Sequence, residues 1–187
     1  MKLRRRTGPV VATLLMFVFA VPAWSKARRK DRGDVYLGFS YVGANLYNDG
    51  SPGMKGWQAA AHFRLLPLLG VEGDFAHYST GNSEFSEQVT TVMFGPRITA
   101  PAGALSFFAH GLAGLAHQNA NLTTYPYVDY DAVSYAFGGG VDIPVFRGWK
   151  FRATADYLGN SKAPTAADLG GLAPSHLRIG GGVAYHF

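Results

Sequence analysis

Large apolar residues alternate with small or polar residues in eight separate segments of this chain, and this period of two limits its fold more than any other feature. Alternation of this kind is typical of a β-strand with one apolar and one polar face, because successive side chains of a strand point to opposite sides. No segment after Asp34 keeps a helical period for three turns. We therefore predict eight strands of about ten residues each. They cover residues 35–41, 57–65, 71–78, 89–100, 105–117, 133–143, 149–158 and 176–187.

Long and short connections alternate strictly between these strands. The long, polar connections are expected at 45–55, 79–87, 118–132 and 159–174. The short ones are expected at 66–69, 101–104 and 144–148. An up-and-down meander places every long connection on one rim, which is the pattern of outer-membrane barrels. In the hydrocarbon of a membrane the sheet must also close, because an open edge would leave backbone groups unpaired. The predicted fold class is all-β, an eight-stranded antiparallel up-and-down transmembrane β-barrel over residues 34–187.

The polar faces of these strands carry four bases and four acids, which we expect to line the lumen as a polar network. They are Arg64, Glu72, Asp74, Arg97, Asp142, Arg152, Asp156 and Arg178. Antiparallel neighbours would place Arg64 beside the strand of Glu72 and Asp74, and Asp142 beside that of Arg152 and Asp156. Because the interior of an eight-stranded barrel is only wide enough for side chains, we predict a plugged lumen without an open pore. A functional alternative is that these carboxylates act in acid–base catalysis or in a proton path. The strand 105–117 has large residues in both phases, so its facing stays open.

The N-terminal residues indicate export. Bases at positions 2–6, an apolar run over 10–21 and the triplet Ala23-Trp24-Ser25 predict a secretory signal peptide at 1–25. The run is too short for a membrane-spanning helix, which needs about 20 apolar residues. A basic arm at 26–33 is expected in the periplasm. The net charge of +5 arises in these two segments, and acids outnumber bases after residue 32, so no nucleic-acid partner is expected.

Metal and cofactor chemistry is not expected either. The chain has no cysteine, which excludes disulfides and thiolate ligands. Its six histidines lie on or at the ends of strands without the compact spacing of a metal site. We therefore predict no metal and no cofactor.

Several motifs on the fourth to eighth strands resemble a known family. They are Gly95-Pro96-Arg97, Phe108-Ala109-His110, Gly138-Gly139-Gly140-Val141-Asp142, Arg152 with Asp156-Tyr157, and Leu177-Arg178 leading to Phe187. In order and register they resemble the outer-membrane β-barrel domain family of OmpA and OmpX type, over essentially the whole chain after the signal peptide. The resemblance implies location in the bacterial outer membrane, contact with its lipids and lipopolysaccharide, and a C-terminal strand recognised by the barrel-assembly machinery. Val183, Tyr185 and Phe187 match that assembly signal.

Function is expected in the outer loops, because recognition usually resides in loops held by a rigid scaffold. The connection 118–132 is the richest in aromatic and acidic residues. Its binding candidates are Tyr125, Tyr127, Asp129, Tyr130 and Asp131. Side chains of these types suit a binding patch, and a solvated or self-packed loop is the alternative. The leading hypothesis is a non-enzymatic protein that serves adhesion, surface interaction or membrane integrity through an unidentified ligand.

Two alternatives remain from the sequence. The segment His77-Tyr78-Ser79 looks like the His and Ser pair of lipid A deacylase barrels, in which a Glu completes the triad, and Glu84 would be that residue. The second alternative is a narrow porin-like channel, against which the charged lumen argues.

Overall fold

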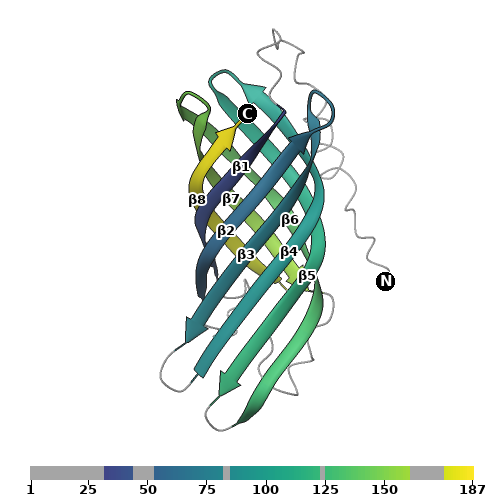
Figure 1. The fold of residues 1–187 in the computed structure, drawn as a ribbon, viewed down its shortest axis with the longest axis vertical. Helices are drawn as coiled ribbons and strands as arrows, with labels where there is room; N and C mark the ends of the chain where they lie inside the picture. The colour runs from purple at the N-terminus through teal and green to yellow at the C-terminus, as the bar shows by residue number, and fades with distance from the viewer. Residues whose placement is uncertain (1–31, 44–52, 82–84, 123–124, 161–174) are drawn as a thin grey trace, which may run out of the picture. The chain divides into compact units, whose positions relative to one another are not determined.

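The computed structural model describes residues 32–43, 53–81, 85–122, 125–160 and 175–187. These residues form eight strands: β1 (Gly33–Val42), β2 (Met54–Arg64), β3 (Leu69–Gly81), β4 (Phe85–Ala102), β5 (Leu105–Leu122), β6 (Tyr125–Phe146), β7 (Trp149–Asn160) and β8 (Ser175–His186). Each strand pairs antiparallel with its neighbours in sequence, and β1 also pairs with β8, so the sheet closes into a barrel (Figure 1). The predicted fold class is confirmed. The predicted signal peptide and most of the basic arm lie outside the described residues.

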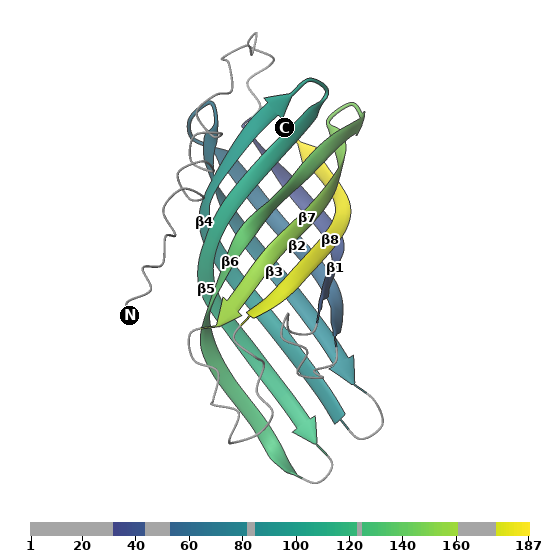
Figure 2. The same cartoon turned by 180° about the vertical axis from the view of Figure 1, so that it is seen from behind.

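Three strands are longer than predicted. The strands β4 and β5 have 18 residues each and β6 has 22. The predicted loops 79–87 and 118–132 are therefore wrong in extent, since most of their residues continue the hairpins β3–β4 and β5–β6. Figure 2 shows both hairpins running on beyond the end of β7. Apolar alternation ends in these segments, which is why the strands were expected to end there. Strand pairing can nevertheless continue in water, where the outer face no longer has to be apolar.

The three short connections lie together at the opposite rim, where the chain also ends (Figure 1). Two of them are tight turns at 103–104 and 147–148. Gly103 and Gly148 adopt φ angles of 64° and 88° there. A residue with a Cβ is strained in this left-handed region, so glycine permits the reversal.

The outer face of the barrel is apolar. Its large exposed side chains include Leu37, Phe39, Phe63, Phe94, Leu115, Phe137, Ile179 and Val183. Phe39 is 82% exposed, which is costly in water and favourable in lipid. The facing of β5 is decided as well, because Phe107 points outward and Phe108 is buried in the lumen. Among the described residues, no helix is long and apolar enough to cross a membrane.

The interior has two layers, which differs from the uniformly polar filling expected. Charged side chains fill the half of the lumen near the short turns. The other half holds a buried apolar cluster of Val42, Met54, Ala76, Tyr78, Val89, Met93, Leu112, Ala136 and Leu158. These residues and the charged ones occupy the inward positions of their strands. The sequence alternation therefore predicted which residues face inward, but it did not predict how polar and apolar residues are distributed along the barrel axis.

Candidate functional site

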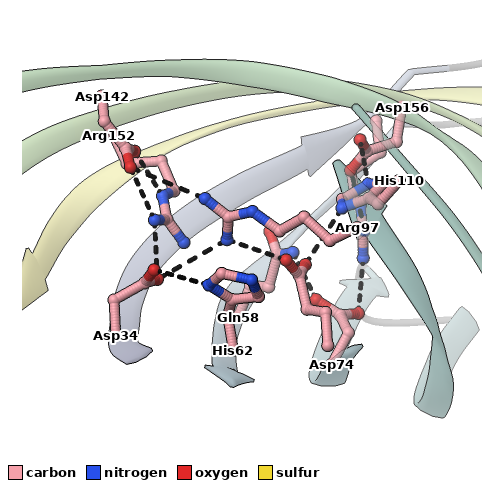
Figure 3. Close-up of polar contacts among 11 residues, drawn as sticks. Asp34, Gln58, His62, Asp74, Arg97, His110, Asp142, Arg152 and Asp156 are labelled. Carbon is pink, nitrogen blue, oxygen red and sulfur yellow. Dashed lines mark hydrogen bonds and ion pairs between the residues drawn. The ribbon is translucent and has the colours of Figure 1, made fainter. Parts of the chain in front are cut away.

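A guanidinium between two carboxylates begins the charge network in the lumen (Figure 3). Arg152 on β7 donates to Asp142 from Nε at 2.6 Å and from Nη2 at 2.9 Å. It also donates from Nη2 to Asp34 on β1, at 2.7 Å. Asp34 in turn lies 3.0 Å from Nδ1 of His62. The register sets Asp142 directly opposite Arg152, whereas the contact with Asp34 reaches over β8 and joins strands that are not neighbours.

Arg97 on β4 connects this group to the middle of the lumen. Its Nη1 donates to Glu72 at 2.8 Å and lies 3.5 Å from Asp34, and its Nη2 lies 3.6 Å from Asp142. The guanidinium also lies over the ring of Phe108, with Cζ 3.8 Å from the ring centroid. A cation above an aromatic face is attracted by the ring quadrupole, so Phe108 helps to hold Arg97 in place.

His110 is the link between two carboxylates. Its Nδ1 lies 3.0 Å from Glu72 and its Nε2 lies 2.9 Å from Asp156. An ionised carboxylate only accepts hydrogen bonds, so both ring nitrogens donate only when the ring is the doubly protonated imidazolium. The geometry therefore assigns His110 a positive charge, which balances one of the five buried carboxylates.

Arg178 on β8 completes the network. It donates from Nε to Asp156 at 2.7 Å and from Nη1 to Asp74 at 2.9 Å. Asp74 also accepts from Nε2 of Gln58. The Nη1 of Arg178 lies 3.4 Å from the hydroxyl of Tyr78, and this contact joins the charged half of the lumen to the apolar half.

The arrangement acts as a structural plug. Buried charges are tolerated only when they are paired and hydrogen-bonded, and here each carboxylate of the network has at least one arginine partner. The contacts cross the lumen between strands that share no backbone pairing, which ties opposite sides of the barrel together. Side chains that neutralise one another in this way favour a closed lumen over conduction.

Seven of the eight residues that sequence analysis placed in the lumen are buried and belong to this network. Arg64 does not join them. It is the last residue of β2, it is exposed, and the register sets it opposite Gly70 at the rim. Arg64 therefore lies beside the strand of Glu72 as expected, but the described bonds of the Glu72 carboxylate are with Arg97 and His110.

Several further members of the network are not among the eight residues expected from the sequence. They are Asp34, Gln58, His62, Tyr78 and His110. Their position in the alternation of each strand could have identified them, because each lies on the strand face that points into the lumen. No sequence motif marks a histidine or an aspartate at the start of a strand as part of such a network. Its partner becomes apparent only when the structure shows which side chain lies opposite it in the lumen.

The three residues of the expected assembly signal lie on the outer face of β8 and beyond its end. Val183, Tyr185 and Phe187 are all exposed. The ring of Tyr185 packs against Trp149 with centroids 5.1 Å apart. Because β8 pairs with β1, these residues mark the strand that closes the barrel.

The residues of the deacylase alternative do not form a triad among the described residues. His77 and Ser79 lie in the outward phase of β3, and Nδ1 of His77 is 2.9 Å from the hydroxyl of Thr90 on β4. Glu84 lies outside the described residues. A nucleophile needs a base within hydrogen-bonding reach, and the bond described for His77 goes to Thr90 instead.

The loop candidates lie in the extension of β6 and not in a loop. The backbone of Tyr125, Asp129 and Tyr130 is paired with β5, Tyr127 lies at an irregularity of that pairing, and the side chains of all four lie outside the described residues. Asp131 is exposed and accepts from Nδ1 of His117 at 2.8 Å, provided that this nitrogen carries the proton. Within the described part of the chain, no group of three or more His, Asp or Glu is placed to hold a metal ion.

Comparison with known proteins agrees with this architecture. The model of the outer membrane protein beta-barrel domain family matches residues 11–187. No curated protein matches the chain in sequence. Among solved structures, the attachment invasion locus protein Ail of Yersinia pestis is similar with 20% identity and a TM-score of 0.57, over 84% of this chain and 99% of that one. Neisserial surface protein A is 14% identical with a TM-score of 0.61, over 83% of this chain and 96% of that one. OprG of Pseudomonas aeruginosa is 15% identical with a TM-score of 0.53, over 84% of this chain and 97% of that one.

Proposed function

The chain belongs to the outer membrane β-barrel domain family and is a protein of the bacterial outer membrane, and from that premise we propose that it is a non-enzymatic surface-interaction protein. The plugged barrel is a rigid anchor. The extension formed by the outer ends of β4, β5 and β6 is the part that meets a partner, in the manner of an adhesin.

One observation supports this proposal above the others. In the extension, β6 pairs with β5 from Tyr125 onward, but its described pairing with β7 begins only at Ser134. Among the described residues, the edge of β6 over 125–133 therefore has no second neighbouring strand. The unpaired backbone groups of such an edge are a template on which an extended segment of another protein can add as a strand.

The charge of the extension narrows the class of partner. Glu87 lies on β4 and Asp129 and Asp131 lie on β6, and the described residues of the extension include no lysine or arginine. Ail of Yersinia pestis has been crystallised with the heparin analogue sucrose octasulfate, which is polyanionic. A polyanion would be repelled by this acidic extension, so we propose an extended polypeptide segment with basic residues as the partner.

Two further contacts are part of the proposal. The apolar outer face suits outer-membrane lipids and lipopolysaccharide. The outward row of Val183, Tyr185 and Phe187 on the closing strand is proposed as the signal for the barrel-assembly machinery. Both proposals rest on the position of exposed apolar side chains on the barrel.

Trimming the extension tests the proposed function. Residues 118–130 are replaced by Asn-Gly, which joins His117 to Asp131 through a two-residue hairpin turn. Because the barrel below this pair is unchanged, we expect normal heat-modifiable mobility on a gel. Adhesion of expressing cells to an epithelial monolayer is expected to fall several-fold, to the level of cells that lack the protein. Unchanged adhesion by the trimmed, folded barrel would contradict the proposal.

The matched control is Ser79→Ala on the neighbouring hairpin, which we expect to adhere like the intact protein. Lipid A extracted from the same cells tests the enzymatic alternative. We expect the same acylation pattern with and without the protein. A deacylated species that disappears in Ser79→Ala would show that the protein is an enzyme.

A further inference from the structure

The rim that carries the short turns is basic. Arg32, Arg64 and Arg147 are exposed there, and no aspartate or glutamate among the described residues of this rim is exposed. We call these three arginines the basic rim. Short turns of outer-membrane barrels face the periplasm. We propose that the basic rim binds the phosphodiester group of an anionic phospholipid in the periplasmic leaflet. This proposal deepens the lipid contact proposed above, on which it rests, and is independent of the extension and its partner.

Two of the three arginines lie side by side. The carbonyl oxygen of Arg32, the residue before β1, accepts from the backbone N–H of Arg64 at 2.9 Å. Arg32 lies two residues before the inward Asp34, and Arg64 lies two residues after the inward His62. Both side chains therefore extend from the same face of neighbouring strands. Like charges opposite each other destabilise a sheet, so an anion between them relieves the repulsion, and phosphate oxygens match the donor geometry of guanidinium groups.

The third arginine lies on the same part of the rim. Arg147 belongs to the turn between β6 and β7, and the carbonyl oxygen of the next residue, Gly148, accepts from the backbone N–H of His186 at 2.9 Å. Phe187 follows His186, and its main-chain oxygen accepts from the backbone N–H of Arg32 at 2.8 Å. These bonds lead from Arg147 across the end of β8 to the start of β1. The basic rim is therefore one continuous surface and not three scattered charges.

Other charged groups near the rim are engaged elsewhere. Lys150 Nζ lies 3.9 Å from the buried Asp142. Asp34 and Asp142 both accept from Arg152 of the lumen network. Within the described part of the chain, no ion pair joins these carboxylates to Arg64, and neither Arg32 nor Arg147 has one. The positive charge of the basic rim is therefore available to an anion from outside the chain.

Apolar side chains beside the arginines favour a lipid as the source of that anion. Cζ of Arg147 lies 5.9 Å from the ring centroid of Phe146, which is 66% exposed. Leu66, two residues after Arg64, is 58% exposed. An arginine beside such groups can extend its guanidinium to the headgroups while the apolar side chains meet acyl chains. A solvated anionic polymer such as peptidoglycan satisfies the charge but leaves these apolar side chains in water.

The tryptophans of the barrel provide a local test. Trp149 lies two residues after Arg147 and is exposed, whereas Trp57 lies toward the other end of β2, seven residues before Arg64. The Trp57→Phe protein, isolated from outer membranes, is reconstituted in phosphatidylcholine bilayers. These contain dibrominated phosphatidylglycerol or, at the same mole fraction, dibrominated phosphatidylcholine. Because bromine quenches the fluorescence of a tryptophan that it contacts, the quenching of Trp149 reports which lipid lies at the basic rim.

We expect phosphatidylglycerol to be favoured over phosphatidylcholine about fivefold at Trp149, the effect of about one arginine near an anionic surface. The preference is expected to fall in about 0.5 M NaCl, because salt screens exposed charges. In a Trp149→Phe protein, Trp57 is expected to show no preference between the two lipids. A preference of equal size at both tryptophans would overturn the proposal.

Variants of the arginines give the matched comparison. Arg32→Gln with Arg64→Gln, and separately Arg147→Gln, should each lower the preference, and the triple variant should abolish it. The control Lys55→Gln removes an exposed base near the other end of β2 and should leave the preference unchanged. Heat-modifiable mobility checks folding, and all variants retain residues 26–31.

Several outcomes would overturn the proposal. One is equal quenching of Trp149 by the two lipids, and another is a preference that survives in the triple variant or in high salt. Arginine-dependent sedimentation with purified peptidoglycan, without a lipid preference, would assign the basic rim to the cell wall instead. Absence of quenching by both lipids would refute the lipid contact of the outer face itself. The salt titration uses no arginine variant, so it decides the role of charge even if the triple variant misfolds.

Discussion

Single side chains in the lumen carry interactions far beyond their own strand. Arg152 neutralises carboxylates of β1 and β6 at once, and Arg178 does the same for β3 and β7. A residue of this kind cannot be judged by its own position, because removing it leaves two buried charges without their strongest partner. Arg64 also lies on the inward face of its strand, β2, but it is exposed at the rim, so its removal leaves no buried carboxylate without a partner.

Replacement of Arg152 by methionine should therefore destabilise the barrel strongly. Methionine keeps an unbranched apolar side chain but leaves Asp34 and Asp142 without their guanidinium, and breaking a buried pair typically costs about 3–5 kcal/mol. Urea unfolding in detergent, followed by gel mobility and tryptophan fluorescence, measures the loss. The control Arg64→Met is expected to change the free energy of unfolding by less than about 0.5 kcal/mol, as exposed substitutions generally do. Equal stability of Arg152→Met and the wild type would refute the role given to the network.

At the scale of the strand, glycine makes room for the charged side chains. Gly138 faces inward on β6, and a Cβ there would overlap Oδ1 of Asp156 and the carbonyl oxygen of Ala155. Gly73 on β3 offers the opposite case, since the nearest atom to a Cβ at that position is a ring carbon of Phe94 at 4.0 Å. The two glycines look alike in the sequence, and only one of them lies against the network.

Alanine substitutions at these two positions should consequently differ in effect. Gly138→Ala must displace Asp156 from His110 and Arg178, and we expect a loss of about 1–3 kcal/mol, as for other overpacked sites. Gly73→Ala adds a methyl group in ordinary contact distance and is expected to be neutral or slightly stabilising. The temperature at which each barrel loses its compact gel mobility checks both. A Gly138→Ala barrel as heat-stable as Gly73→Ala would mean that the space beside Asp156 is not needed.

The whole molecule combines a closed sheet, a plugged interior and an extension above the lipid belt. Closure satisfies every strand edge within the belt, and the buried charges in the described part of the lumen pair with one another.

A plugged barrel should not conduct steadily. In planar bilayers we expect the purified protein to give no unitary current steps, since an ion would have to separate pairs such as Arg178 and Asp74, 2.9 Å apart. Regular steps from the wild-type protein would contradict the plug.

The sequence by itself determined the eight strands, the closed topology, the inward and outward phases of every strand except β5, and most of the charged residues in the lumen. Period-two alternation is a local property, and outward apolar faces demand lipid, so these features needed no knowledge of distant contacts. The tertiary structure alone decided the facing of β5, the length of the β4 to β6 extension, the bridging role of His110 and the separation of the lumen into a charged and an apolar half. The physical reason is that each of these depends on which side chains meet across the barrel, and barrel curvature and register bring together residues such as Asp34 and Arg152 that are 118 positions apart in the chain.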